Sequence, residues 1–193
     1  MELINNTSKT LKDDLSVEIK KGSKLSIAAA CFSIYAFQEL KKQLTSIEEL
    51  RFIFTSPTFV AEKTKKEKRE FYIPRLNRER SLYGTEFEIK LRNEMTQKAI
   101  AKECADWIKE KVTFKSNISD KTIQGQLVVD DTGYTPINNF TTVELGCEKG
   151  NVISTTIVKD QSLAQTLIRD FNEIWNDKKV LQEVTDEVVE SIT

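Results

Sequence analysis

Histidine is absent from the 193 residues of this sequence, and glycine is scarce, with only six residues. Without histidine the chain can form no Ser-His-Asp triad, no Cys-His pair and no histidine-ligated zinc site. The six glycines form neither G-x-x-x-x-G-K-[ST] nor G-x-G-x-x-G, the patterns whose loops grip phosphates in NTPases and dinucleotide enzymes. We therefore expect no ATP motor within this chain, no bound cofactor and no metal site.

Cysteine and long apolar runs are also sparse. The three cysteines, Cys31, Cys104 and Cys147, are an odd number without C-x-x-C spacing, so we expect reduced thiols in a cytoplasmic protein. The first residues contain no basic segment followed by an apolar one, and no apolar run approaches the roughly 18 residues of a membrane span. The expectation is a protein without a membrane partner.

What the sequence does contain is the balance of a globular domain, with 39% hydrophobic and 31% charged residues. The net charge of −1 conceals an uneven distribution. Residues 61–80 carry eight Lys and Arg against four acids, whereas residues 160–193 carry three against eight. The chain therefore combines a basic middle with an acidic C-terminal part.

Apolar spacing predicts alternating strands and helices. The expected helices cover about 8–21, 37–45, 95–108 and 163–175, and the expected strands cover 24–32, 50–55, 112–114, 123–129 and 151–158. The first strand, helix and strand after residue 22 are typical of a βαβ unit with parallel strands. Between residues 56 and 92 the periodicity fails, and prolines and dense charge indicate an excursion over the surface.

The last stretch, residues 178–193, places apolar residues on one stripe with acids opposite. This pattern predicts a C-terminal helix after a domain of residues 1–176. Such a stripe needs a partner to cover it, so residues 177–193 either pack on the domain or, as we expect, lead into a following domain.

A basic run in the surface excursion is a candidate nucleic-acid contact, because such clusters bind phosphate backbones and neighbouring aromatic residues can stack on bases. Phe71 and Tyr72 are interleaved with it. Its basic residues are Lys63, Lys65, Lys66, Lys68, Arg69, Arg75, Arg78 and Arg80. The alternative is a solvated loop in which four acids dilute the charge.

Paired acids offer two further candidates. Asp13-Asp14 lies in the first expected helix, where adjacent residues point apart, and we expect it to face solvent. Asp130-Asp131-Thr132-Gly133 is typical of a turn between strands.

An E-x-K triplet suggests a metal-dependent nuclease as another alternative. In a strand Glu86, Glu88 and Lys90 would share one face, as two metal-binding carboxylates and a lysine do in restriction-type nucleases. Two more E-x-K triplets occur elsewhere in the chain, so the motif alone has little specificity.

The stretch TIQGQLVVDDTGYTPINNFTT, residues 122–142, carries a resemblance to a known family. It resembles the phospholipase D-like family, in which H-x-K-x-x-x-x-D precedes a G-S-x-N-type segment, or S-N-F-T in helicase-associated members. In that pattern Gln124 replaces the histidine, Gln126 the lysine, and Asp131 matches the aspartate. Asn139 with Phe140-Thr141 matches N-F-T, while Pro136-Ile137 replaces Gly-Ser. The order of elements over most of residues 8–176 also fits.

The resemblance implies an α/β fold, a phospholipase D-like mixed sheet flanked by helices. It also implies lost catalysis, because glutamine has neither a nucleophilic nitrogen at neutral pH nor a pKa useful for proton transfer. Domains of this type occur at the N-terminus of bacterial superfamily-two helicases, including DEAD/DEAH-box, Swi/Snf-like, restriction and defence proteins. The leading hypothesis is therefore a non-catalytic accessory domain that binds DNA or positions a helicase motor in the same polypeptide.

A second hypothesis is a protein-interaction module that does not touch nucleic acid. Active members of the family need two motif copies, in tandem or across a dimer, and this chain has room for one, so homodimerisation through the remnant is included. The near-neutral net charge and the acidic C-terminal part favour this hypothesis.

Overall fold

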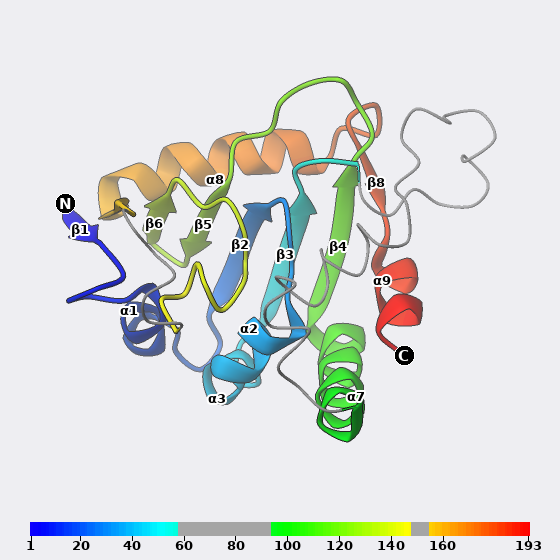
Figure 1. Ribbon diagram of the computed structural model, residues 1–193. Coiled ribbons are helices and arrows are strands. Elements are labelled where there is room, and N and C mark those ends of the chain that lie inside the picture. Colours follow the sequence, from blue (N-terminus) through cyan, green and yellow to red (C-terminus); the bar gives the residue numbers. More distant parts are fainter. Residues whose placement is uncertain (58–93, 148–154) are drawn as a thin grey trace.

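The computed structural model describes residues 1–57, 94–147 and 155–193, and within these ranges an eight-stranded mixed sheet forms the centre of the molecule (Figure 1). The strand order is β1-β7-β6-β5-β2-β3-β4-β8. The strands are β1 (Glu2–Ile4), β2 (Lys24–Ala29), β3 (Glu49–Phe54), β4 (Val112–Asn117), β5 (Gln126–Val129), β6 (Thr132–Thr135), β7 (Ile157–Asp160) and β8 (Leu181–Glu183).

Three parallel strands, β2, β3 and β4, lie in the middle of the sheet, and every other pairing is antiparallel. The predicted βαβ unit is confirmed: β2 leads through two short helices into β3. The helices are α1 (Leu11–Glu18), α2 (Ile34–Glu39), α3 (Lys41–Leu44), α7 (Glu94–Lys111), α8 (Gln161–Trp175) and α9 (Thr185–Ile192). The fold class, a mixed α/β sheet flanked by helices with a C-terminal helix, is confirmed.

Side-chain caps fix where three of these helices begin. The Thr10 hydroxyl accepts a hydrogen bond from the Asp13 N–H, the Ser33 hydroxyl accepts from Tyr35, and the Asp160 carboxylate accepts from Ser162. Each cap satisfies a backbone N–H that has no partner within its helix, and losing such a cap typically costs about 1 kcal/mol.

The main core lies between one face of the sheet and the helices α1, α2, α7 and α9. Alternation along β3 and β4 directs Phe52, Phe54 and Phe114 into this core. Phe32, which follows β2, packs its ring edge-on against Phe52 at 5.6 Å and against Phe114 at 5.2 Å, measured between ring centroids. Edge-to-face aromatic pairs add about 0.5–1.5 kcal/mol each beyond their buried area.

The helix α8 covers the opposite face of the sheet. It begins beside β6 and lies on the side of the molecule away from α7 (Figure 1). Its apolar side contributes Phe171, Ile174 and Trp175 to a smaller core with Ala28 and Ile53. The helix predicted over 163–175 is thereby confirmed.

The C-terminal stretch differs from the single helix predicted over 178–193. Residues Leu181–Glu183 form β8, which pairs with β4, and α9 begins only at Thr185. The Asp177 carbonyl accepts hydrogen bonds from the N–H groups of Val180 and Leu181 and turns the chain into the strand. Val180 and Leu181 join the smaller core, whereas the apolar residues of α9 join the main one, so the apparent stripe divides between two faces.

The remaining predicted boundaries differ by a few residues. The helix predicted over 8–21 covers Leu11–Glu18, and the helix predicted over 37–45 is two short helices that meet at Leu40. The last predicted strand begins at Ile157, after residues that lie outside the described ranges. No disulfide joins the three cysteines, and burial raises the pKa of the Cys104 thiol above its ordinary value.

Candidate functional site

The first two motif positions lie where β5 begins. Gln126 pairs with Ala28 near the carboxyl end of the neighbouring strand β2, and Gln124 precedes it with an exposed side chain. The amide nitrogen of Gln126 donates a hydrogen bond of 3.1 Å to the Leu167 carbonyl of α8. Gln126, which replaces the lysine of the family motif, therefore attaches α8 to the sheet.

The segment after β6 approaches this place closely. The Ile137 N–H donates to the Gly125 carbonyl at 3.2 Å, and a Cβ atom on Gly125 would lie 1.6 Å from the Ile137 carbonyl oxygen. No side chain fits there, so the glycine between the two glutamines lets the two segments touch.

Asn139, the last of the four motif positions, is half-buried at the same end of the sheet. Its neighbours are bonded to the segment that follows β2: the Asn138 carbonyl accepts from the Ala30 N–H at 2.9 Å, and the Phe140 N–H donates to the Cys31 carbonyl at 2.8 Å. Gln124 and Asn139 thus lie beyond the carboxyl ends of parallel strands, where open α/β sheets commonly bind ligands.

Glu144 is a carboxylate at this edge that the sequence did not single out. It accepts a hydrogen bond of 2.8 Å from the Asn138 N–H. Burial raises the pKa of Glu144, while the backbone N–H groups of Asn138 and Asn139 act in the opposite direction. Its partners are backbone groups, so Glu144 holds the shape of the loop that carries Asn139.

Asp131, the third of the four motif positions, lies at the other end of the strands. It is exposed in the turn between β5 and β6, as the turn pattern predicts. Its neighbour Asp130 has a φ of 49° and accepts hydrogen bonds from the Ser23 hydroxyl and the Lys24 N–H, at the amino end of β2. The six residues of β2 separate this turn from Gln124 by roughly 16 Å, at about 3.3 Å per residue.

The four motif positions therefore do not converge on one site. Gln124 and Asn139 lie at the carboxyl edge of the parallel strands, Gln126 is bonded to α8, and Asp131 lies in the turn at the opposite end. The amides at this edge can donate and accept hydrogen bonds, but none can act as a nucleophile or transfer a proton at neutral pH.

Asn117, at the end of β4 on the same edge, shows how such amides are used here. Its Nδ2 atom donates to the carbonyls of Thr55 and Lys121, and its Oδ1 atom accepts from the N–H and the hydroxyl of Ser119. All of these partners belong to the fold, which makes Asn117 a structural residue.

Asp14 corrects the expectation that Asp13-Asp14 faces solvent. Asp13 is exposed, but Asp14 is buried and accepts hydrogen bonds from the Tyr134 hydroxyl at 2.6 Å and from Lys159 at 3.1 Å. Lys159 also bonds to Glu18 at 2.8 Å. The helix pattern alone contains no signal for these partners, since they come from β6 and β7.

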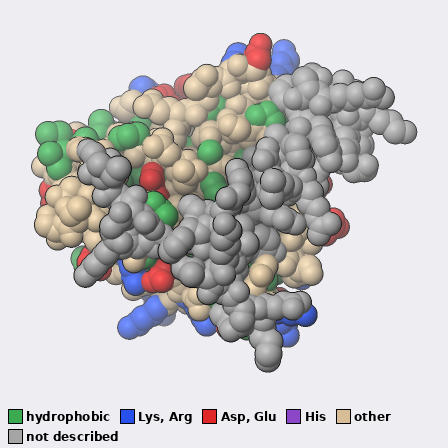
Figure 2. All heavy atoms as spheres, viewed as in Figure 1, with side chains coloured by type: hydrophobic (Ala, Val, Ile, Leu, Met, Phe, Trp, Pro, Cys, Tyr) green, Lys and Arg blue, Asp and Glu red, His purple; other side chains and the backbone are tan. Residues whose placement is uncertain are grey.

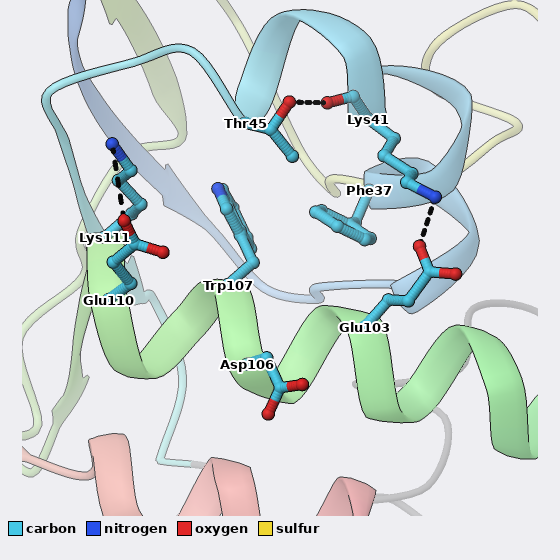
Figure 3. Close-up of a pocket in the computed structure, with 8 residues that line it drawn as sticks. All are labelled: Phe37, Lys41, Thr45, Glu103, Asp106, Trp107, Glu110 and Lys111. Atoms are coloured by element: carbon cyan, nitrogen blue, oxygen red, sulfur yellow. Dashed lines mark hydrogen bonds and ion pairs between the residues drawn. The ribbon is translucent and has the colours of Figure 1, made fainter.

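A groove between α2, α3 and α7 is the pocket that the close-up shows (Figure 3), with a volume of about 260 Å³. Its lining residues are Phe37, Lys41, Thr45, Glu103, Asp106, Trp107, Glu110 and Lys111. Lys41 forms an ion pair with Glu103 across it, and the Trp107 indole N–H donates to the Leu44 carbonyl at 2.8 Å. No nucleophile faces a base here, so the groove has no catalytic arrangement.

Two sets of sequence candidates lie outside the described residues: the basic run, Lys63 to Arg80, and the triplet Glu86, Glu88 and Lys90.

Across the residues that are described, no group of three His, Cys, Asp or Glu is placed to hold a metal ion. In the same ranges, no helix combines the length and apolar composition that a bilayer crossing needs. On the face drawn in Figure 2, the described basic and acidic side chains are interspersed.

No protein-family model and no curated protein match this chain. Among solved structures, the chain is similar to one from TrmBL2, described as an archaeal chromatin protein that shows a novel mode of DNA binding. The TM-score is 0.42 at 12% sequence identity, and the match covers 95% of this chain and 52% of that one. This chain thus spans about half the length of that protein chain. A likeness of this size assigns no function.

Proposed function

We propose that this chain is a non-catalytic phospholipase D-like accessory domain that binds DNA. The observation that carries the non-catalytic part is the arrangement of the motif positions. Gln124 and Asn139, both amides, lie at one edge, Gln126 is bonded to α8, and Asp131 lies at the opposite end of the strands.

The missing chemistry explains why such a domain would be retained for binding. Phosphodiester cleavage by this family type needs a nucleophilic nitrogen and an acid for the leaving oxygen. Neither exists at these positions, whereas the Gln124 and Asn139 amides are still able to hydrogen-bond to phosphate oxygens.

The DNA-binding part rests on the basic run, Lys63 to Arg80, whose eight cations would neutralise backbone phosphates. The family resemblance adds the context, a helicase motor of the superfamily-two type in the same polypeptide. In that context the domain would hold DNA beside the motor or position the motor on it.

The test is DNA binding by the purified chain at several salt concentrations, measured by fluorescence anisotropy. We expect the affinity to fall steeply with salt, and to fall further when Lys65, Lys66, Lys68 and Arg69 are changed to Glu. The matched control reverses four exposed lysines on the described surface, Lys20, Lys21, Lys42 and Lys109, which changes the net charge equally. Equal losses in both variants, or binding insensitive to salt, would contradict a DNA contact through the basic run.

The second candidate is an interaction module that dimerises or docks on the motor without touching nucleic acid. The net charge of −1 and the acidic residues 160–193 favour it, because a negative surface repels phosphate backbones. Light scattering over a range of protein concentrations, combined with the anisotropy assay, separates the two candidates: self-association without DNA binding supports the interaction module.

A further inference from the structure

Two cations lie side by side on the α8 face of the sheet. Arg51 of β3 pairs with Thr113 of β4, and Lys115 lies two residues further along β4, so the two side chains point to the same face. Both are half-buried. The face is the one that α8 covers, opposite the main core.

Arg51 and Lys115 share one aromatic ring. The guanidinium carbon of Arg51 lies 5.5 Å from the centroid of the Trp175 indole and 4.9 Å from that of the Phe171 ring. The Lys115 ammonium lies 4.4 Å from the same indole centroid. Because the Phe171 and Trp175 rings are themselves stacked at 5.6 Å, the end of α8 forms a rigid aromatic wall beside both charges.

Neither cation has a carboxylate partner among the described residues, although that part of the chain contains nine ion pairs elsewhere. Glu49 and Glu183 are the acids that act on them electrostatically, and both side chains are exposed. Burial is the main cause that lowers the pKa of both groups, and Arg51 and Lys178 add like-charge repulsion at Lys115. The cluster therefore carries positive charge that no ion pair within the described ranges neutralises, in a partly desolvated place.

The two side chains also retain hydrogen-bond donors. Arg51 has five N–H donors, and one bond is formed within the described residues, from Nη2 to the Ser26 hydroxyl at 3.0 Å. Lys115 has three, and one bond is formed there, to the Trp175 carbonyl at 2.9 Å. These bonds hold each cation in place and, as far as the described residues go, leave other donors of both side chains available.

We propose that Arg51 and Lys115 form an oxyanion-binding site that takes a phosphate group, with the backbone phosphate of DNA as its source. The identity of the source rests on the proposed function, whereas the site itself does not. A guanidinium fork and a neighbouring ammonium suit a tetrahedral oxyanion, because both donate charge-assisted hydrogen bonds. Lys178, exposed near Lys115, extends the positive field toward solvent.

Arg51 and Lys115 belong neither to the four motif positions nor to the basic run. If the cations served only to cover the aromatic wall with their aliphatic stems, their charge would have no effect on any ligand. The test therefore removes the charge with glutamine, which keeps a shorter polar side chain, and compares it with Lys115→Arg, which keeps the charge.

The first arm titrates the purified chain with inorganic phosphate and follows tryptophan fluorescence, against chloride at equal ionic strength. Trp107 is buried in the other core, so the saturable change should come from Trp175 and vanish in Trp175→Phe. We expect the double variant Arg51→Gln/Lys115→Gln to weaken phosphate binding about tenfold or more. The control Lys21→Gln/Lys24→Gln removes two exposed lysines and should bind as wild type.

The second arm measures DNA binding by the same variants. A loss in both arms supports the site with DNA as the source. Phosphate binding without any effect on DNA supports the oxyanion site and removes DNA as its source. Phosphate binding by a chain that binds no DNA at all contradicts the proposed function while the site stands. An unsaturable phosphate response, or equal binding by the double variant, would overturn the site.

Lys115→Arg provides a second variant, since it retains the charge and should retain binding. Thermal melting followed by circular dichroism checks that each variant is folded. If the double variant does not fold, Lys115→Gln alone, at a half-buried edge of the cluster, carries the same comparison with Lys115→Arg.

Discussion

The Tyr134 hydroxyl and the Asp14 carboxylate form a hydrogen bond of 2.6 Å across 120 residues of sequence. Tyr134 is fully buried and Asp14 is 8% exposed, so this bond joins α1 to β6 inside the molecule. Burial is the main cause that raises the pKa of Tyr134, and the Asp14 carboxylate raises it further. The tyrosine hydroxyl is the donor in this bond, and the Asp14 carboxylate is the acceptor.

Removing one partner should destabilise the chain measurably. We expect Tyr134→Phe to lower the free energy of unfolding by about 1–3 kcal/mol, because it removes the hydroxyl donor from a buried carboxylate oxygen, which keeps Lys159 beside it. Asp14→Ala should cost more, about 3–5 kcal/mol, since it also removes a partner of Lys159. Urea unfolding measures both. Asp13→Ala is the exposed neighbour control and should change stability far less.

Gly125 should tolerate no side chain. An alanine Cβ would lie 1.6 Å from the Ile137 carbonyl oxygen, so Gly125→Ala must move backbone and should cost roughly 3 kcal/mol, the upper end for overpacking. Gly22→Ala is the comparison: its φ of +82° makes alanine strained, but nothing lies within 4 Å of the added atom. A Gly125 variant as stable as the Gly22 variant would contradict the close approach at the motif edge.

Glu144 should make the stability of the chain depend on pH. Its pKa is raised by burial, so between its ordinary value of 4.5 and the raised value the folded state binds more protons than the unfolded state. Stability must then decrease as pH rises through this window. In Glu144→Gln this contribution should disappear, while an oxygen acceptor remains for the Asn138 N–H. Thermal melting of both proteins from pH 4 upward measures the difference, and parallel pH profiles would count against it.

The purified chain should cleave no phosphodiester. With amides at Gln124 and Gln126, a chromogenic phosphodiester incubated with the chain should release no product above the buffer rate. Cleavage that disappears in Gln124→Ala would show that the remnant is active. Cleavage that needs Mg²⁺ and disappears in Glu88→Ala would instead favour the nuclease alternative through Glu86, Glu88 and Lys90.

Local pattern was enough to predict the elements whose apolar residues face one core. Leu163, Leu167 and Phe171 recur at i, i+4 and i+8 and form α8, and the βαβ unit of β2 and β3 follows from two apolar runs around a helical one. The same reasoning failed for Val180 and Leu181, because the stretch distributes its apolar residues between two cores, which a single helical stripe cannot represent.

The candidate site was harder to predict from the sequence. Asp14 gains its importance from Tyr134 and Lys159, which are more than 100 residues away along the chain. Arg51 lies between Leu50 and Phe52 in the sequence and Lys115 between Phe114 and Ser116, and only the period-two alternation of β3 and β4 indicates that they share a face. Their common ring, Trp175, belongs to a helix that the alternation cannot place.

The outermost strands of the sheet, β1 and β8, are three residues long. An edge strand presents unpaired N–H and C=O groups with which a strand of another chain can pair, and a short edge strand offers few such groups. Neighbouring copies therefore have little means of extending this sheet into a continuous ribbon. If two copies do associate, they should meet through helices and loops, which leaves the eight-stranded framework unchanged.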